Sequence, residues 1–218
     1  MSELPGRIAA RALLPGANVF GKVFWDLSVM GRENLPLHGP MVLASNHFSH
    51  IDPPLVGMVL GRLVRFIALD ELFGDHWWFD RLMLFFGAIP TDRDGYPVAA
   101  LRTAVEHLRG GGAMGVFPEG ARVVRWRERP PKRGAAWLAW MSGAPLVPVA
   151  IHGSDGTMVP GDLTFRRTAV KIWIGEPLWW HRYADRVDPL GAMMDDWAAW
   201  VGERIEPWTG LTTTRETL

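Results

Sequence analysis

Residues 41–54 read MVLASNHFSHIDPP, and this stretch decides the class of fold. Met41–Ser45 is a short apolar run, which is typical of a strand buried on both faces. Pro53 and Pro54 follow Asp52, and this order indicates the start of a helix, because aspartate caps helices and proline needs no backbone donor in the first turn. A buried strand that passes through a polar loop into a helix is the repeating unit of α/β proteins.

Outward from this stretch, short apolar runs alternate with segments of helical period. In one such segment Val98, Leu101 and Val105 follow the spacing of a helix face, and Gly110 marks its end. We expect a single α/β domain with a largely parallel central sheet flanked by helices. Further strands are predicted at 63–68, 113–118, 145–151 and 168–175, and helices at 74–86, 96–109, 134–142 and 190–205.

The N-terminal part of the chain carries an amphipathic pattern. Residues 17–30 put their large apolar side chains on one helical stripe, and such a helix can lie in a membrane interface. Packing of this helix against the core is the alternative interpretation. We expect an N-terminal amphipathic, membrane-associating segment at 1–35 and a main domain at 36–210. No transmembrane helix is predicted, because a span requires about 20 apolar residues without a break.

The composition excludes several classes of function. The 218 residues carry 23 Lys and Arg against 23 Asp and Glu, so the net charge is zero and a general nucleic-acid binder is not expected. Cysteine is absent, which excludes disulfide scaffolds, cysteine-ligated zinc and thiol nucleophiles. Hydrophobic residues make up 48% of the chain, which is enough for a sizeable core.

The loop after the first quoted strand holds a candidate for acid–base chemistry. His47 follows the strand end and Asp52 opens the next helix, and open α/β sheets place their sites at the carboxyl ends of strands. A histidine near a carboxylate is the arrangement of a general base and the group that orients it. Two other interpretations stay open: Asp52 only caps a helix, or His47, His50 and Asp52 ligate a metal ion.

Two further loops carry groups suited to an anion. Arg93 follows a Gly/Pro turn at 87–90, and a guanidinium offers a fork of donors that suits phosphate. The turn at 117–122 reads FPEGAR directly after a predicted strand. Residues 121–133 hold five Arg and one Lys against one Glu, a local net charge of +5. This charge predicts an anion-binding patch for a phosphorylated substrate, a phosphopantetheine-type carrier or an anionic bilayer.

Taken together, these blocks resemble the glycerolipid acyltransferase family, which includes lysophosphatidic acid and glycerol-3-phosphate acyltransferases. The family's blocks are matched in order at 46–52 (NHFSHID), 87–93 (GAIPTDR), 117–122 (FPEGAR) and 147–151 (VPVAI), with a Lys-x-Gly at 132–134. The resemblance covers residues 38–155. Two departures are Ala121, where the family has threonine, and the Arg-rich stretch that replaces a shorter serine-rich segment.

The resemblance implies an acyl transfer with His47 and Asp52 as the general base pair. His47 would deprotonate a glycerol hydroxyl, which attacks the thioester of acyl-CoA or acyl carrier protein; a hydroxyl needs such a base near neutral pH. The acceptor is expected to be 1-acylglycerol-3-phosphate, with glycerol 3-phosphate or another lysophospholipid as the alternative. No cofactor and no metal are expected. The resemblance implies that the substrate is bound by Ser49, Arg93, Glu119, Gly120, Arg122 and Lys132.

The expected partners are acyl-CoA or acyl carrier protein, a lysophospholipid or glycerol 3-phosphate, and a membrane surface. The protein is expected in the cytoplasm, bound peripherally to the inner face of the cell membrane. The domain at 36–210 is the acyltransferase catalytic domain in this interpretation. Two other functions stay open: a catalytically inactive lipid-binding protein, and a hydrolase in which His47 activates water on a thioester.

Overall fold

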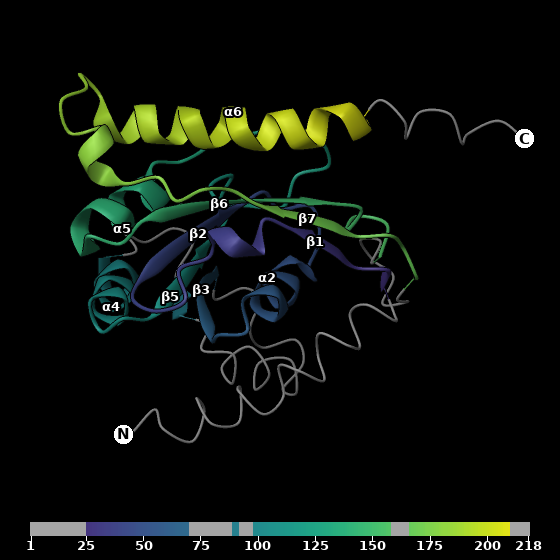
Figure 1. Ribbon diagram of the computed structural model, residues 1–218, viewed down its shortest axis with the longest axis horizontal. Helices are drawn as coiled ribbons and strands as arrows, with labels where there is room; N and C mark the ends of the chain where they lie inside the picture. The colour runs from purple at the N-terminus through teal and green to yellow at the C-terminus, as the bar shows by residue number, and fades with distance from the viewer. Residues whose placement is uncertain (1–24, 70–88, 92–97, 158–165, 210–218) are drawn as a thin grey trace, which may run out of the picture.

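A seven-stranded sheet forms the centre of the protein within residues 25–69, 89–91, 98–157 and 166–209, which the computed structural model describes (Figure 1). The strand order is β1-β7-β6-β2-β5-β3-β4. The strands are β1 (Ser28–Met30), β2 (Met41–Ser45), β3 (Val64–Leu69), β4 (Ile89–Thr91), β5 (Ala113–Val116), β6 (Leu146–His152) and β7 (Lys171–Ile174). Neighbouring strands are parallel except β6 with β7. The prediction of a largely parallel sheet is confirmed.

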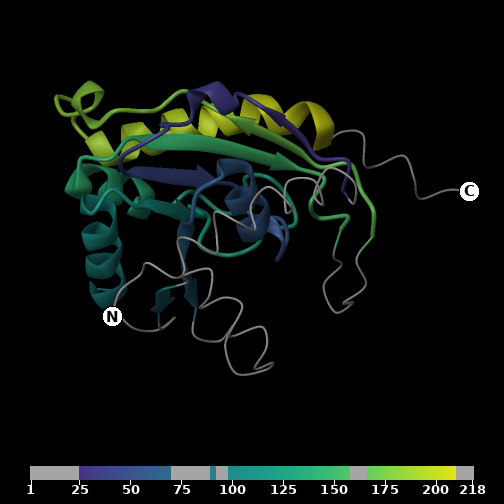
Figure 2. The same ribbon diagram turned by 60° about the horizontal axis from the view of Figure 1, so that its bottom comes forward.

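Helices cover both faces of this sheet (Figures 1 and 2). They are α2 (Asp52–Leu60), α4 (Val98–Arg109), α5 (Gly134–Ser142) and α6 (Pro189–Thr209), with short 3-10 turns at η1 (Arg32–Asn34) and η3 (Trp180–Arg182). Helix α2 packs on one face, and α4, α5 and α6 pack on the other. None of the helices in the described ranges is both long and apolar enough to cross a bilayer.

Strand β2 shows how the sequence builds these layers. Val42 and Ala44 belong to the core beneath α4, α5 and α6, while Met41 and Leu43 belong to the core on the α2 side. Successive side chains of a strand point to opposite faces, so a strand covered on both faces must be apolar throughout. Every residue of β2 is buried. The loop that follows β2 therefore starts from a strand that is packed on both faces of the sheet.

Most predicted elements are confirmed. The strands predicted at 41–45, 63–68, 113–118, 145–151 and 168–175 correspond to β2, β3, β5, β6 and β7, and the helices at 96–109, 134–142 and 190–205 to α4, α5 and α6. The helix predicted at 74–86 lies outside the described residues. Strands β1 and β4 were not predicted, because three residues are too few to show a period. Strand β4 occupies part of the segment that was interpreted as a Gly/Pro turn.

The predicted amphipathic helix at 17–30 is wrong from Asp26 onward: residues 26–27 are not helical, and Ser28–Met30 form β1 and pair with β7. Its residues 17–24 lie outside the described part of the chain. Trp25 and Leu27 are buried in the core on the α2 side. The sheet therefore begins inside the segment 1–35 that was predicted to be separate from the main domain. Backbone pairing with β7 decides the conformation here, and the apolar spacing does not reveal it.

The side chain of Asn46 extends the pairing of β2 with β6 beyond the end of β2. Its Nδ2 donates to the carbonyl of Ile151 at 2.9 Å, and its Oδ1 accepts from the Ile151 N–H at 2.8 Å. Asn46 is fully buried, so both backbone groups of Ile151 depend on this amide instead of water. The first residue of the loop is thereby attached to the middle of the sheet.

We expect Asn46→Ala to lower the free energy of unfolding by about 2–4 kcal/mol, because two buried backbone groups of Ile151 lose their partner. Urea denaturation of the full chain measures this change. Asn34→Ala is the matched control, since Asn34 makes one bond, to the carbonyl of Ile174 at 2.9 Å, in a less buried position. A loss of about 1 kcal/mol is expected there. Equal losses in the two variants would contradict this role of Asn46.

Candidate active site

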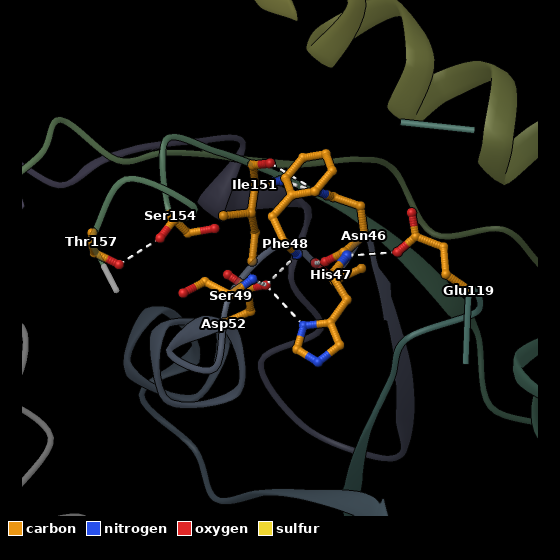
Figure 3. Close-up of polar contacts among 10 residues, drawn as sticks. Asn46, His47, Phe48, Ser49, Asp52, Glu119, Ile151, Ser154 and Thr157 are labelled. Carbon is orange, nitrogen blue, oxygen red and sulfur yellow. Dashed lines mark hydrogen bonds and ion pairs between the residues drawn. The ribbon is translucent and has the colours of Figure 1, made fainter. Parts of the chain in front are cut away.

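His47 and Asp52 meet where β2 has ended and α2 begins (Figure 3). Nδ1 of His47 lies 2.9 Å from Oδ2 of Asp52. The side chain of Asp52 is completely buried, whereas 15% of the His47 side chain is exposed. The carboxylate thus lies behind the ring, and the ring itself reaches the surface.

Asp52 does not act as the cap of α2. It is the first residue of the helix, and Ile51 occupies the cap position. The Asp52 carboxylate turns back toward the loop, where its Oδ2 also accepts from the backbone N–H groups of Phe48 and Ser49, each at 2.7 Å. The interpretation of Asp52 as a helix cap alone is therefore wrong, because its oxygen serves the loop that carries His47.

These bonds determine which nitrogen of His47 carries a proton. An ionised aspartate only accepts hydrogen bonds, so Nδ1 must donate the proton shared with Asp52. In the neutral ring, Nε2 then holds a lone pair. Figure 3 shows Nε2 directed away from Asp52. This is the arrangement of a general base with an orienting carboxylate.

A column of aromatic rings supports His47. Its ring stacks on Phe117, with the ring centroids 4.0 Å apart and the planes inclined by 16°. Phe117 stacks in turn on Phe66, at a centroid distance of 5.5 Å. Phe66 fits because Gly115 has no side chain; a Cβ atom there would lie 2.1 Å from the Phe66 ring. The column spans β3, the end of β5 and the His47 loop, and it limits rotation of the imidazole.

Glu119 joins the turn after β5 to the loop after β2. Its Oε2 accepts from the backbone N–H of His47 at 2.7 Å, and Figure 3 shows Asp52 and Glu119 on opposite sides of His47. Glu119 is buried, and its Oε1 has no hydrogen-bond partner among the described residues. Burial raises the pKa of Glu119 to about 8, against the opposing effect of the bond from His47. Glu119 is therefore largely protonated at neutral pH.

The other predicted site residues in the described part of the chain lie on the loop of His47 and on the segment that follows β5. Gly120 has a φ of +72°, and a Cβ atom there would lie 2.7 Å from Nζ of Lys132, so Lys132 covers this turn. The charge of Arg122 helps to lower the pKa of His50, after the larger effect of desolvation, and this places Arg122 close to His50. Ser49 is buried, and its hydroxyl has no hydrogen-bond partner among the described residues.

The basic patch predicted at 121–133 is partly neutralised. Nη2 of Arg127 lies 2.9 Å from Oε1 of Glu206, and Arg133 pairs with Asp188. Both acidic partners come from outside the patch, from α6 and from the segment just before it. The surface charge of the patch is therefore lower than the +5 of its own sequence.

Two further predictions concern Arg93 and a metal site. Arg93 lies outside the described residues. In the part of the chain that the structure describes, no group of three or more His, Asp or Glu side chains is arranged to hold a metal ion. Nδ1 of His47 is instead bonded to Asp52. The alternative interpretation of His47, His50 and Asp52 as metal ligands is not supported.

Known proteins are similar to this chain in the sequence and the fold that build this site. Residues 26–152 match the protein family described as Acyltransferase. The chain belongs to this family. The resemblance carried by the four sequence blocks is confirmed, and so is the prediction that the chain is an acyltransferase enzyme.

Individual relatives agree with this assignment. The acyltransferase is 33% identical over 153 residues to a 1-acyl-sn-glycerol-3-phosphate acyltransferase of Bacillus subtilis, a match that covers 70% of this chain and 73% of that protein. It is also 30% identical over 173 residues to a chloroplastic 1-acyl-sn-glycerol-3-phosphate acyltransferase of Brassica napus. That match covers 77% of this chain and 48% of the relative. The crystal structure of the LPA acyltransferase PlsC from Thermotoga maritima matches with a TM-score of 0.69 at 26% identity, over 96% of this chain and 83% of that one.

Sequence reasoning did not single out Asn46 or Phe117. Asn46 anchors the loop to β6, and Phe117 stacks on the ring of His47. The only sign of their importance in the sequence was that both lie inside blocks that match the acyltransferase family. Their roles depend on contacts between segments that are distant in the sequence, which no local pattern reveals.

The raised pKa of Glu119 predicts that stability falls as the pH rises. The unfolded carboxyl loses its proton near its ordinary pKa of 4.5 and the folded one near about 8. Between these values the folded state binds more protons than the unfolded state, so the free energy of unfolding decreases with increasing pH. Glu119→Gln keeps an acceptor for the His47 N–H but does not ionise, and we expect it to flatten this decrease.

Urea denaturation at several pH values between 4.5 and about 8 measures this effect for the wild-type chain and for Glu119→Gln. Glu106→Gln is the control, because Glu106 is an exposed carboxylate on α4. The control should keep the wild-type slope. A Glu119→Gln variant with the same slope would show that Glu119 is ionised in the folded acyltransferase.

Proposed function

We propose that the protein transfers a fatty acyl group from acyl-CoA or acyl carrier protein to a hydroxyl of a glycerol-phosphate acceptor, principally 1-acylglycerol-3-phosphate. The observation that carries this proposal is the 2.9 Å bond between Nδ1 of His47 and the buried carboxylate of Asp52. The names of the relatives from Bacillus subtilis, Brassica napus and Thermotoga maritima support the choice of acceptor.

In the proposed reaction His47 acts as the general base. Its Nε2 takes the proton of the acceptor hydroxyl while the oxygen attacks the thioester carbonyl. The negative charge of Asp52 stabilises the imidazolium that forms. The tetrahedral intermediate then collapses, the carbon–sulfur bond breaks, and the proton on Nε2 goes to the departing thiolate. The products are the acylated glycerol phosphate and a free thiol, and His47 is again neutral.

The acceptor phosphate is proposed to bind beside this base. Arg122 and Lys132 are exposed cations at the turn that contains Glu119 and Gly120, and cations with several donors suit a phosphate. Arg93 is proposed to join them. The buried hydroxyl of Ser49 and the protonated carboxyl of Glu119 each offer a donor next to the loop of His47.

Other acceptors and functions make different demands on this site. Glycerol 3-phosphate or another lysophospholipid would use the same base and the same cations. A hydrolase would need no site for an acceptor phosphate, so the cations at the turn favour transfer. A lipid-binding protein without activity would not need the bond between His47 and Asp52. Because the acceptor is a lipid, we propose that the protein works in the cytoplasm, bound peripherally to the inner face of the membrane.

We expect His47→Ala to lower kcat by about 10²–10⁴-fold, because a positioned general base contributes that much, and Asp52→Asn to lower it by up to about the same factor, because Asp52 orients that base and stabilises its charged form. The asparagine keeps an oxygen for the three donors around Asp52 but removes the charge that stabilises the imidazolium. The assay uses purified protein with palmitoyl-CoA or oleoyl-CoA and lysophosphatidic acid, and follows free thiol and acylated lipid together. Thiol release without acylated lipid would instead identify a hydrolase.

We expect Arg122→Gln to raise the KM for lysophosphatidic acid by about 10–100-fold, the effect of losing one or two charge-assisted hydrogen bonds. The KM for the acyl-CoA should stay near its wild-type value. Arg133→Gln is the matched control, because that guanidinium is paired with Asp188, and its KM for the acceptor should change little. Equal effects of the two substitutions on the acceptor would contradict a phosphate site at Arg122.

A further inference from the structure

Residues 122–132, here called the basic loop, are attached to the active site at both ends. The N–H of Val123 donates to the carbonyl of His47 at 2.9 Å, and the N–H of Lys132 donates to the carbonyl of Pro118 at 2.7 Å. The segment between these anchors leaves the site and returns to it. The two ends of the basic loop therefore lie beside the site at which acyl transfer is proposed.

The basic loop has a defined internal structure. Oε2 of Glu128 accepts from the N–H groups of Val124 and Arg125 at 2.9 and 3.3 Å. The N–H of Glu128 donates to the carbonyl of Arg125 and closes a turn, in which Arg127 has a φ of +66°. A residue with a side chain is unfavourable in this left-handed region, so contacts elsewhere must hold the turn in place.

Helix α6 supplies those contacts. The ring of Trp126 packs edge-on against Trp197 at a centroid distance of 5.7 Å, and Arg127 pairs with Glu206. One side of the basic loop is thus fixed to α6. Its other exposed side chains are presented from a fixed support and not from a loose segment.

The cations of the basic loop fall into two groups. Arg127 is paired with a carboxylate of α6. Arg122, Arg125, Arg129 and Lys132 are exposed, and none of them has an ion-pair partner among the described residues. Between Arg122 and Arg125 stands Val124, which is 85% exposed. The free surface of the basic loop therefore combines unpaired cations with a large apolar side chain in water.

We infer that the basic loop is a docking surface for an anionic lipid bilayer. Cations attract the negative phosphates of the head groups, and a protruding apolar side chain enters the hydrocarbon boundary just beneath them. On the basic loop Val124 supplies the exposed apolar side chain, and Arg125 and Arg129 supply the unpaired cations. Docking here would bring His47 close to the membrane, where a lipid acceptor resides. The inference rests on the proposed function for the statement that the acceptor is a lipid. The binding of the protein to vesicles does not depend on that function.

The test measures binding of the full chain to vesicles of phosphatidylglycerol and phosphatidylcholine in equal parts, by co-sedimentation. Because each cation near such a surface strengthens binding about fivefold, the double variant Arg125→Gln/Arg129→Gln should bind about 25-fold more weakly. Val124→Ser should bind about three- to tenfold more weakly. Vesicles of phosphatidylcholine alone should bind the wild type weakly, and added salt should weaken binding to the anionic vesicles.

Arg127→Gln is the matched control, since it removes one cation that is already paired with Glu206. It should bind the anionic vesicles within about twofold of the wild type. If Arg127→Gln instead weakened vesicle binding about fivefold, as much as the loss of one unpaired cation, net charge and not the unpaired surface would govern binding. Unchanged binding of the double variant to anionic vesicles would overturn the inference. It would also be overturned if the double variant bound acyl carrier protein more weakly than the wild type but bound the vesicles equally well.

Activity separates this inference from the proposed function. With a short-chain lysophosphatidic acid that stays dissolved, and no vesicles, the double variant should keep the wild-type kcat and KM. With the acceptor in anionic vesicles, its turnover should fall in step with its binding. If the wild type does not acylate the dissolved acceptor at all, the proposed function fails, whatever the vesicles show.

Discussion

A carboxylate that has lost its water must be surrounded by hydrogen-bond donors, and the fully buried Asp52 imposes this condition on the loop after β2. Its Oδ2 takes two backbone N–H groups and Nδ1 of His47. The loop can satisfy Oδ2 only in a conformation that brings these three donors to one point, while Oδ1 is buried without a hydrogen-bond partner among the described residues. The same conformation presents the other nitrogen of His47 to the substrate. Stability of the loop and orientation of the base therefore have one cause.

The neighbouring strand supplies the second half of the site. Because β5 pairs in parallel with β2, the turns that follow the two strands meet at the same edge of the sheet. Glu119 and Phe117 thereby reach the backbone and the ring of His47. The charge of Asp52 adds to the burial that keeps Glu119 protonated. Two buried carboxyl groups near one histidine thus differ in charge, and each has a distinct use.

The sequence allowed most of the sheet and helices to be predicted, because long apolar runs and helical spacing are local properties. Strand β1 escaped prediction: its three residues become a strand through pairing with β7, far along the chain. The sequence also did not predict that Glu206 and Asp188 neutralise part of the positive charge at 121–133, because both acidic residues lie far from that segment in the sequence. Asp52 was predicted at the start of a helix, but only the folded loop shows that its carboxylate faces backward.

The sequence by itself determined the alternation of strands and helices, the order of the four blocks and the residue types that the chemistry needs, because each of these is carried by neighbouring residues. Tertiary structure decided which groups meet. It placed Phe117 on the ring of His47, buried Glu119 against the His47 backbone, and directed the amide of Asn46 to β6. It also fixed the basic loop on α6 through Trp126. These outcomes depend on strand order and on burial, and burial sets the charge and the hydrogen-bond needs of a side chain only once the chain has folded around it.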